Sequence, residues 1–146
     1  LKPETVFTED FIQSVHKRMY GNVWAWAGEF RNSNKNIGVD KWQITTELRY
    51  LLDDVKYWYA NNTYQPDEIT IRFKHRLVSI HCFPNGNGRH SRLVADIVIE
   101  KIFKLPVYTW GAANLVKQGD QRAAYLKAIK AADTGNIQPL IIFARS

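Results

Sequence analysis

Apolar residues recur every three or four positions over much of the chain, the spacing that places them on one face of a helix. The pattern predicts helices over residues 8–20, 45–60, 66–80, 88–103, 119–132 and 136–145. Thr8 is a suitable N-cap for the first helix and Gly21 a suitable stop. Pro66 stands at the first position of the third helix, where its missing N–H leaves no bond unmade. The fourth helix is apolar around much of its circumference, so we expect it at the centre of the fold.

The helical spacing fails between residues 30 and 44. Turn-forming residues are mixed there with residues that favour extended backbone. The segment predicts a β-hairpin or an ordered loop, and the fold class that we expect is mainly α with a small β-hairpin. Just before it stand Trp24 and Trp26, for which burial against neighbouring helices is favoured over an aromatic platform for bases.

The composition is that of one ordinary soluble domain, with 45% hydrophobic and 23% charged residues. Five Trp, seven Tyr and seven Phe exclude a disordered chain. No stretch approaches the roughly 20 apolar residues of a membrane span, so no membrane partner is expected. The single cysteine, Cys82, excludes an internal disulfide and favours a reducing, cytoplasmic location. We expect a single domain over residues 1–146, whose natural start lies upstream of Leu1.

The chain is basic, with 20 Lys and Arg against 14 Asp and Glu and a formal charge of +6. Such an excess is typical of proteins with a phosphate-bearing partner, either nucleic acid or nucleotide. Many ordinary domains carry a similar charge for solubility alone. The charge therefore becomes informative only together with a site.

The segment that carries chemistry is residues 81–92, His-Cys-Phe-Pro-Asn-Gly-Asn-Gly-Arg-His-Ser-Arg. Its two glycines flank an asparagine and let the backbone turn tightly and approach a ligand. The turn leads into the N-terminus of an apolar helix, where free N–H groups and the helix dipole favour an anion. Arg89 and Arg92 lie on one face of that helix and would clamp a polyphosphate. His81, at the end of the preceding helix, is a candidate general base.

Each part of this segment has a plain structural explanation when taken alone. Asn-Gly and Gly-Arg pairs are common in turns. A histidine at the end of a helix is more often structural than catalytic. The combination of turn, helix start, paired arginines and histidine is what favours a phosphate site.

The segment resembles the signature of the Fic family, His-x-Phe-x-(Asp/Glu)-Gly-Asn-Gly-Arg-x-x-Arg. Seven of its eight specified positions match, at His81, Phe83, Gly86, Asn87, Gly88, Arg89 and Arg92. Residues 23–31 are similar to the family's entry into its β-hairpin flap, and residues 125–140 to its closing helices. The resemblance covers nearly the whole chain and is closest to the mobile mystery protein B subgroup. It implies a bacterial Fic-type helical bundle with a small β-hairpin flap.

Fic proteins move a phosphate-containing group, typically AMP from ATP, onto a hydroxyl side chain of a target protein. By this resemblance His81 would remove the proton from a Ser, Thr or Tyr hydroxyl, which attacks the α-phosphorus as pyrophosphate leaves. The backbone N–H groups of residues 86–88 would form the anion hole, and the Asn87 side chain would help to hold the α-phosphate. Arg89 and Arg92 would hold the outer phosphates.

Two further positions of the signature have expected roles in the loop. Phe83 would anchor it in the core, and Cys82 would be a packing residue. Asn85 departs from the family pattern, in which an Asp or Glu helps to bind Mg²⁺. Its amide oxygen is a weaker ligand for a hard cation. We expect ATP as substrate. Mg²⁺ would bind weakly through Asn85 or chiefly through phosphates and water. The alternatives are reduced activity, another nucleotide donor, or a catalytically silent nucleotide-binding regulatory module.

The partner that the resemblance implies is a target protein with a modifiable hydroxyl. Its backbone would pair with the flap residues Lys35, Asn36, Ile37, Gly38 and Val39. Many Fic proteins are restrained by a helix with the motif Ser/Thr-x-x-x-Glu-Gly/Asn. Residues 5–10 fit that spacing but end in Asp, so a helix cap is favoured there. An inhibitory segment upstream of Leu1 or an antitoxin-like partner is a further expectation.

Two other functions stay open at this point. A basic nucleic-acid-binding domain would take its phosphate contacts from His75, Arg76, Arg89, His90 and Arg92, although nucleic acid is not the partner that we favour. Transfer of the γ-phosphate is disfavoured, because the family members that perform it carry an altered loop and residues 86–89 follow the usual pattern.

Overall fold

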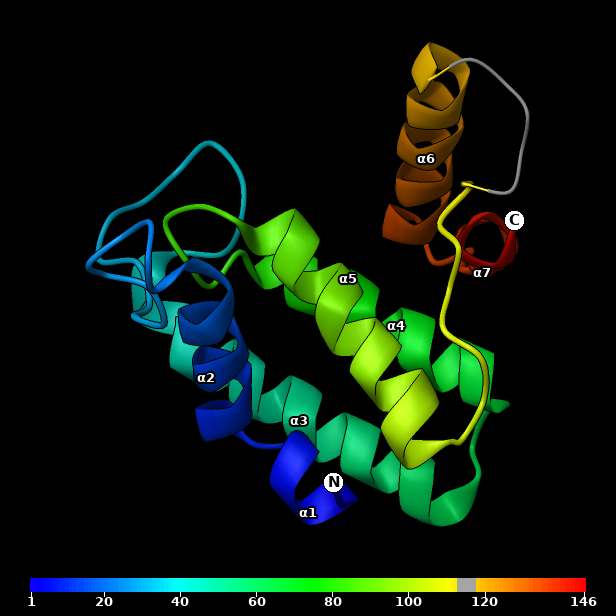
Figure 1. The fold of residues 1–146 in the computed structure, drawn as a ribbon, viewed down its shortest axis with the longest axis horizontal. Helices are drawn as coiled ribbons and strands as arrows, with labels where there is room; N and C mark the ends of the chain where they lie inside the picture. Colours follow the sequence, from blue (N-terminus) through cyan, green and yellow to red (C-terminus); the bar gives the residue numbers. More distant parts are fainter. Residues whose placement is uncertain (113–117) are drawn as a thin grey trace.

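The computed structural model of the chain describes residues 1–112 and 118–146. These residues form helices joined by loops, in the order α1 (Pro3–Val6), α2 (Glu9–Tyr20), the 3-10 turn η1 (Lys41–Gln43), α3 (Ile44–Asn61), α4 (Pro66–Ile80), α5 (Asn87–Ile97), the π-helical turn η2 (Val98–Ile102), α6 (Gln118–Asp133) and α7 (Gln138–Arg145) (Figure 1). The predicted mainly α class is confirmed. No helix in the described ranges is long and apolar enough to cross a bilayer.

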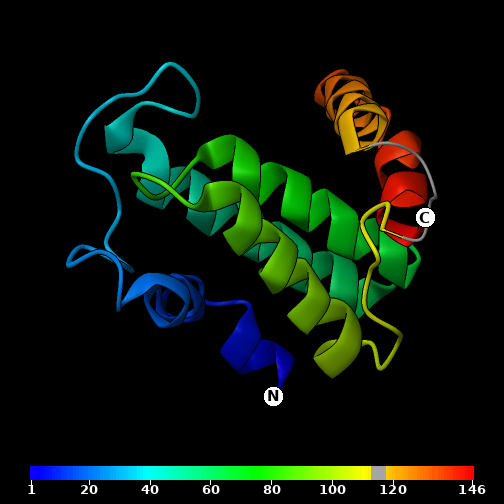
Figure 2. The same ribbon diagram turned by 45° about the horizontal axis from the view of Figure 1, so that its top comes forward.

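Helix α4 lies at the centre of the fold and packs against α3, α5 and α7. Figures 1 and 2 show α3, α4 and α5 side by side, with α2 on one side and the pair α6–α7 on the other. One cluster of buried side chains, which includes Leu51 and Phe73, fills the space among α1 to α5. A second, which includes Ile71 and Leu140, joins α4 and α5 to α6 and α7. Since α5 contributes to both clusters, it shares with α4 the central position predicted for it.

The start of α2 follows from its sequence. Thr8 Oγ1 accepts a hydrogen bond from the Phe11 N–H (3.1 Å) and donates one to the Thr5 carbonyl (2.8 Å). The first turn of α2 is therefore capped by a side chain that satisfies one of its unpaired donors. The predicted N-cap is confirmed, and residues 5–10 are a helix cap.

The predicted β-hairpin is wrong. Residues 31–40, which we call the flap segment, form an ordered loop, and the described part of the chain contains no β-strand. Both arms of the loop bond through backbone N–H groups to residues at the end of α4: the Arg31 N–H donates to the Cys82 carbonyl (2.9 Å), and the Val39 N–H to the Ile80 carbonyl (3.3 Å). Donors that a hairpin would pair across two strands are satisfied here by a helix terminus.

The predicted burial of two tryptophans is incomplete. Trp24 and Trp26 are each partly exposed, and their rings stack with centroids 4.6 Å apart. Trp24 also packs on Tyr20, at 4.7 Å between centroids. The three rings form a small aromatic surface beside the end of α2.

Candidate active site

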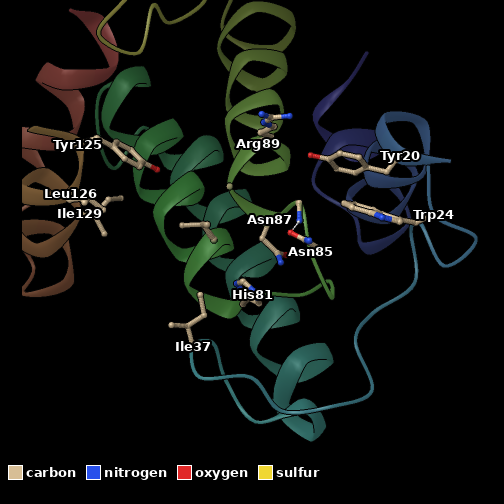
Figure 3. A pocket seen from close by; sticks show the side chains of 13 residues that line it. Tyr20, Trp24, Ile37, His81, Asn85, Asn87, Arg89, Tyr125, Leu126 and Ile129 are labelled. Carbon is tan, nitrogen blue, oxygen red and sulfur yellow. Dashed lines mark hydrogen bonds between the residues drawn. The ribbon is translucent and has the colours of Figure 1, made fainter. Parts of the chain in front are cut away.

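A cleft of about 610 Å³ opens beside the turn that joins α4 to α5 (Figure 3). It is lined by Tyr20, Trp24, Ile37, Val78, His81, Asn85, Gly86, Asn87, Gly88, Arg89, Tyr125, Leu126 and Ile129. In Figure 3 the turn and His81 lie between two apolar walls, Tyr20 with Trp24 on one side and residues of α6 on the other. Segments far apart in the sequence therefore meet around the predicted phosphate site.

The turn depends on two residues with left-handed backbone. His81 ends α4 with φ 57°, and Gly86 caps α5 with φ 79°. A Cβ at position 86 would lie 2.5 Å from the Tyr20 ring, so both space and conformation require glycine there. A non-glycine residue seldom adopts the φ of His81, which indicates that its neighbours hold it in place.

The loop is fixed from inside by two buried residues. Phe83 is fully buried and stacks on His16 with ring centroids 3.8 Å apart, which confirms its predicted role as an anchor. The Asn87 side chain accepts from the Phe83 N–H (3.0 Å) and donates to the Phe83 carbonyl (2.8 Å). The amide predicted to help hold an α-phosphate is thus committed to the loop, and Asn87 offers the cleft its backbone N–H.

The N-terminus of α5 is open toward the cleft. The first helical hydrogen bond runs from the His90 N–H to the Gly86 carbonyl (3.0 Å), so the N–H groups of Asn87, Gly88 and Arg89 precede it and have no carbonyl within the helix. The Gly86 N–H, in contrast, donates to Asn85 Oδ1 (2.8 Å). Three free donors at the positive end of a helix dipole form a site for an anion.

The two predicted phosphate arginines occupy different positions. Arg89 is exposed and lines the cleft. Arg92 is half-buried, with its guanidinium 4.5 Å from the Tyr125 ring centroid and 5.3 Å from that of Trp110. Only Arg89 therefore faces the cleft directly, whereas Arg92 lies behind Tyr125.

Tyr125 also accepts a hydrogen bond from a buried lysine. Lys74 in α4 is fully buried, and its Nζ donates to the Tyr125 hydroxyl (2.6 Å). Burial lowers the pKa of Lys74. Burial raises the pKa of Tyr125, but the Lys74 and Arg92 cations outweigh it and hold that pKa below its usual value. The α6 wall of the cleft thus has two cations behind it.

His81 has the electrostatics of a base. Burial lowers its pKa, and the cations Arg31 and Lys35 lower it further. The imidazole is therefore neutral at pH 7, with a lone pair available to accept a proton. Cys82, next to it, is buried in the main core, and burial raises its thiol pKa to about 12, which confirms it as a packing residue.

Arg31 is a site residue that the sequence did not reveal. It is only 3% exposed, and its Nε donates to the His81 carbonyl (2.6 Å). Its Nη1 and Nη2 make three further hydrogen bonds, to carbonyls of the flap segment and of the last turn of α4. An arginine in a polar, turn-rich segment normally points to solvent, so the sequence carries no signal of this role.

His16 was missed although a signal existed. It follows Ile12 by four residues and thus shares the buried face of α2. Its Nδ1 accepts from the Gly28 N–H (2.9 Å), so Nε2 carries the proton that is donated to the Asn85 carbonyl (2.9 Å). Burial lowers the pKa of His16 and favours this neutral form. His16 therefore ties the loop of the cleft to α2.

The side chains present do not fit a resident Mg²⁺ site. Asn85 brings one neutral oxygen to the cleft, and that atom already accepts from the Gly86 N–H. Within residues 1–112 and 118–146 no group of three or more His, Cys, Asp or Glu is placed to hold a metal. A hard divalent cation takes about six oxygen ligands. At this cleft they would have to come from phosphates and water.

The residues of the nucleic-acid alternative are not gathered on one face. His90 is 1% exposed and donates to the Ile12 carbonyl (2.9 Å). His75 bonds Asp133 (2.8 Å), and Arg76 bonds Asp54 (2.6 Å). These five residues therefore do not form the continuous basic surface that would follow a phosphate backbone.

Comparisons with known proteins find relatives of a single family. A model of the Fic/DOC family matches residues 6–99. The Drosophila grimshawi protein adenylyltransferase Fic is 29% identical over 136 residues, which cover 90% of this chain and 26% of that protein. Its Aedes aegypti namesake is 26% identical, over 97% of this chain and 28% of that protein. The chain thus spans about a quarter of the length of the curated relatives that it matches.

Solved structures share the fold. Fic-1 from C. elegans has a TM-score of 0.73 and 24% identity, covering 94% of this chain and 39% of that chain. BepC from Bartonella tribocorum, with bound AMPPNP, has a TM-score of 0.67 and 18% identity over 95% of this chain and 73% of its own. A Fic domain from Bartonella quintana with bound ADP has a TM-score of 0.70 and 17% identity over 99% of this chain and 74% of its own.

Proposed function

Because the chain belongs to the Fic/DOC family, we propose that it transfers AMP from ATP to a Ser, Thr or Tyr hydroxyl of a target protein. The names of its curated relatives support this activity. One structural observation carries it: a histidine with a lowered pKa and an open helix N-terminus lie at the same turn. A base beside an anion site is what attack of a hydroxyl on a phosphate ester requires.

His81 is the proposed base. It accepts the proton of the target hydroxyl, whose oxygen forms a bond to the α-phosphorus. The bond from that phosphorus to the bridging oxygen breaks, and pyrophosphate leaves with the electron pair. The proton then passes from His81 to solvent. Because burial and two nearby cations keep the imidazole neutral, the base is ready at pH 7.

The start of α5 is the proposed phosphate site. The N–H groups of Asn87, Gly88 and Arg89 would bind phosphate oxygens, where the helix dipole adds to their attraction. Nothing lies within 4 Å of a Cβ built at Gly88, so the absence of a side chain leaves this approach open. The Arg89 guanidinium would hold an outer phosphate from the cleft, and Arg92 would add positive charge from behind Tyr125.

Mg²⁺ would enter as part of the substrate, bound to the phosphates of ATP. The single neutral oxygen of Asn85 would contribute little to the affinity of the protein for Mg²⁺. The residues of this chain would therefore act by positioning the nucleotide and by removing the proton.

The flap segment is the proposed docking site for the target. Residues 32–38 are all exposed, and Ile37, which is 64% exposed, lines the cleft. An extended target segment would pair with the exposed backbone of this loop and present its hydroxyl to His81. The exposed Ile37 side chain would pack against the target.

The test is transfer of label from ATP. The purified chain with Mg²⁺ and ATP labelled at the α-phosphate should label itself or a protein in a lysate. His81→Ala should abolish the label. His75→Gln, a histidine change on the same helix but outside the cleft, should leave it. Absence of label with every nucleotide tried, in spite of measurable binding, would refute the transferase.

The alternative is a nucleotide-binding regulatory module without catalysis. The observation that favours it is Asn85, whose Oδ1 bonds the Gly86 N–H where the family pattern has an acidic metal ligand. Such a module should bind ATP in a calorimeter, lose that binding in Arg89→Ala and keep it in His81→Ala. Transfer of label by the unmodified protein would exclude it.

A further inference from the structure

One charged side chain outside the phosphate site lies in contact with the base. Arg31 is 3% exposed, although residues 32–38, which follow it, are all exposed. Its Nε donates to the His81 carbonyl (2.6 Å), and its Nη1 to the Ser33 carbonyl (2.9 Å). Its Nη2 donates to the Val39 carbonyl and to the Ile80 carbonyl (3.3 Å). The guanidinium thus joins two carbonyls of the flap segment to two at the end of α4.

We propose that Arg31 is a positioning residue that holds the flap segment and His81 together as one unit, so that the base is in place when the flap is seated. The proposal rests on the proposed function in treating His81 as a base, whereas the contacts of Arg31 with His81 and the flap segment do not depend on the reaction.

The end of α4 explains why an arginine is suited to this place. The last carbonyls of a helix have no partner within it and form the negative end of its dipole. The planar guanidinium carries five N–H donors in a fixed fork and keeps its charge when buried. Arg31 therefore satisfies the Ile80 and His81 carbonyls and has donors left for the flap. Because the Arg31 Nε bond reaches the backbone carbonyl of His81, Arg31 stabilises the left-handed conformation that points the imidazole into the cleft.

The backbone makes a second connection between the same two parts. The Arg31 N–H donates to the Cys82 carbonyl (2.9 Å) and the Val39 N–H to the Ile80 carbonyl (3.3 Å). A Cβ built at Gly38 would lie 2.6 Å from the His81 Cβ and 2.9 Å from Arg31 Nη2. The flap backbone therefore packs directly against the His81 side chain, as the proposed coupling requires.

The charge of Arg31 has a consequence for the proton. The cations that lower the pKa of His81, after burial itself, are Arg31 and Lys35, and both belong to the flap segment. A flap that leaves the end of α4 would take both cations and part of the burial with it. The pKa of His81 would then rise toward its ordinary value of 6.5, so that in mild acid a larger share of the imidazole would be protonated and unable to accept a proton.

The first experiment uses two variants at position 31. In Arg31→Met we expect hydrogen exchange of the backbone amides at positions 31 and 39, which donate to the Cys82 and Ile80 carbonyls, to become about tenfold faster or more. The imidazole of His81, followed by NMR during a pH titration, should reach its midpoint at higher pH than in the unmodified protein. Arg31→Lys should show both changes to a smaller degree, because an ammonium cannot serve four separated carbonyls. Arg72→Gln, which removes a half-buried cation from α4 away from the cleft, should show neither change.

A reciprocal variant keeps Arg31 and disturbs its partner. Gly38→Ala places a methyl group against the His81 Cβ and forces an alanine into a backbone with φ 92°. We expect faster exchange in the flap segment and a higher midpoint for His81, as in Arg31→Met. Because position 38 is exposed, we expect this variant to fold. It therefore tests the coupling of the flap segment to His81 even if both changes at Arg31 prevent folding.

Coupling demands that both readouts change together. Unchanged flap exchange, or an unchanged His81 titration, in a folded variant at position 31 or 38 would overturn the proposal. Neither readout needs turnover, so a protein without transferase activity would refute the proposed function and leave this test intact. Where transfer is measurable, Arg31→Met should lower the rate at pH 7 by about 10- to 100-fold and move the acid limb of its pH profile upward.

Discussion

Two buried cations lie near the cleft, one bonded to the flap segment and one to the α6 wall, and they are held in different ways. Arg31 lies under the flap segment and donates to four backbone carbonyls. Lys74 lies beneath the α6 wall and donates to one phenol hydroxyl, that of Tyr125. Burial lowers the pKa of Lys74, whereas a guanidinium keeps its charge in such a place.

The contrast separates two uses of a buried charge. A guanidinium at a helix C-terminus meets the negative end of the dipole and fixes several groups at once. An ammonium beside a phenol and a second cation, Arg92, gains much less from its surroundings. We therefore expect Arg31 to stabilise the fold around His81 and Lys74 to contribute little stability.

The largest difference should follow from replacing each cation by methionine. Arg31→Met should lower the free energy of unfolding by about 4 kcal/mol, because four carbonyls lose charged donors and some stay buried without a partner. Lys74→Met should change it by less than about 1 kcal/mol or raise it, because an apolar side chain of similar length replaces a costly buried charge. Urea unfolding at pH 7 measures both, and equal losses would contradict the comparison.

Acid should destabilise the fold through the buried histidines of α2 and α5, which lie away from both cations' hydrogen bonds. Burial lowers the pKa of His90 from its ordinary 6.5 to about 4. Above pH 6.5 both folded and unfolded chains are neutral at this position. As the pH falls from 6.5 to 4 the unfolded chain binds the proton first, so unfolding becomes easier by roughly 3 kcal/mol.

The measurement is urea unfolding between pH 7 and pH 4. His90→Gln keeps a side-chain donor for the Ile12 carbonyl but has no titrating group, so its stability should fall less over this range. An equal acid dependence in the variant would assign the effect to other groups, among them His16, whose pKa burial also lowers.

A smaller effect is expected from Asn85, in the turn between α4 and α5. Asn85→Asp restores the carboxylate that the Fic signature has at this position, and it faces the cleft. We expect half-maximal transfer at a Mg²⁺ concentration roughly tenfold lower, since a charged oxygen is a better ligand for a hard cation. Titration of activity with Mg²⁺ measures this. An unchanged requirement would mean that phosphates and water alone set the affinity.

The smallest effect is expected at the phenol. Tyr125→Phe removes the acceptor of the Lys74 hydrogen bond and leaves the ring on which Arg92 stacks. Stability at pH 7 should fall by about 1 kcal/mol. In the double variant with Lys74→Met the loss should shrink, because the bond is already absent; additive losses would show that the two groups act independently.

Much of the local structure was predictable from the chain. Helix α2 begins at its predicted cap, and Pro66 opens α4 as expected. The turn between α4 and α5 lies where its glycines and the helix after it predicted it, and Phe83 anchors it in the core. Turn chemistry, capping and helical periodicity act over a few residues, so a single sequence contains them.

The errors arose where distant segments meet. The flap segment carries turn and extended residues typical of a hairpin, but its donors bond to Ile80 and Cys82, which are more than 40 residues away. The Asn87 amide, expected in the cleft, is occupied by Phe83. Such hydrogen-bond partners depend on which groups tertiary packing brings together, and local propensity does not predict them.

The sequence by itself determined that this protein has a helical fold and a glycine-containing turn between two helices within residues 81–92, because spacing and residue type suffice for both. Only the tertiary structure decided that Arg89 faces the cleft while Arg92 stacks behind Tyr125. It also decided that His81 lies beneath the flap segment with Arg31 against its carbonyl. The pKa of a base depends on its burial and on the charges around it, and both are properties of the folded molecule.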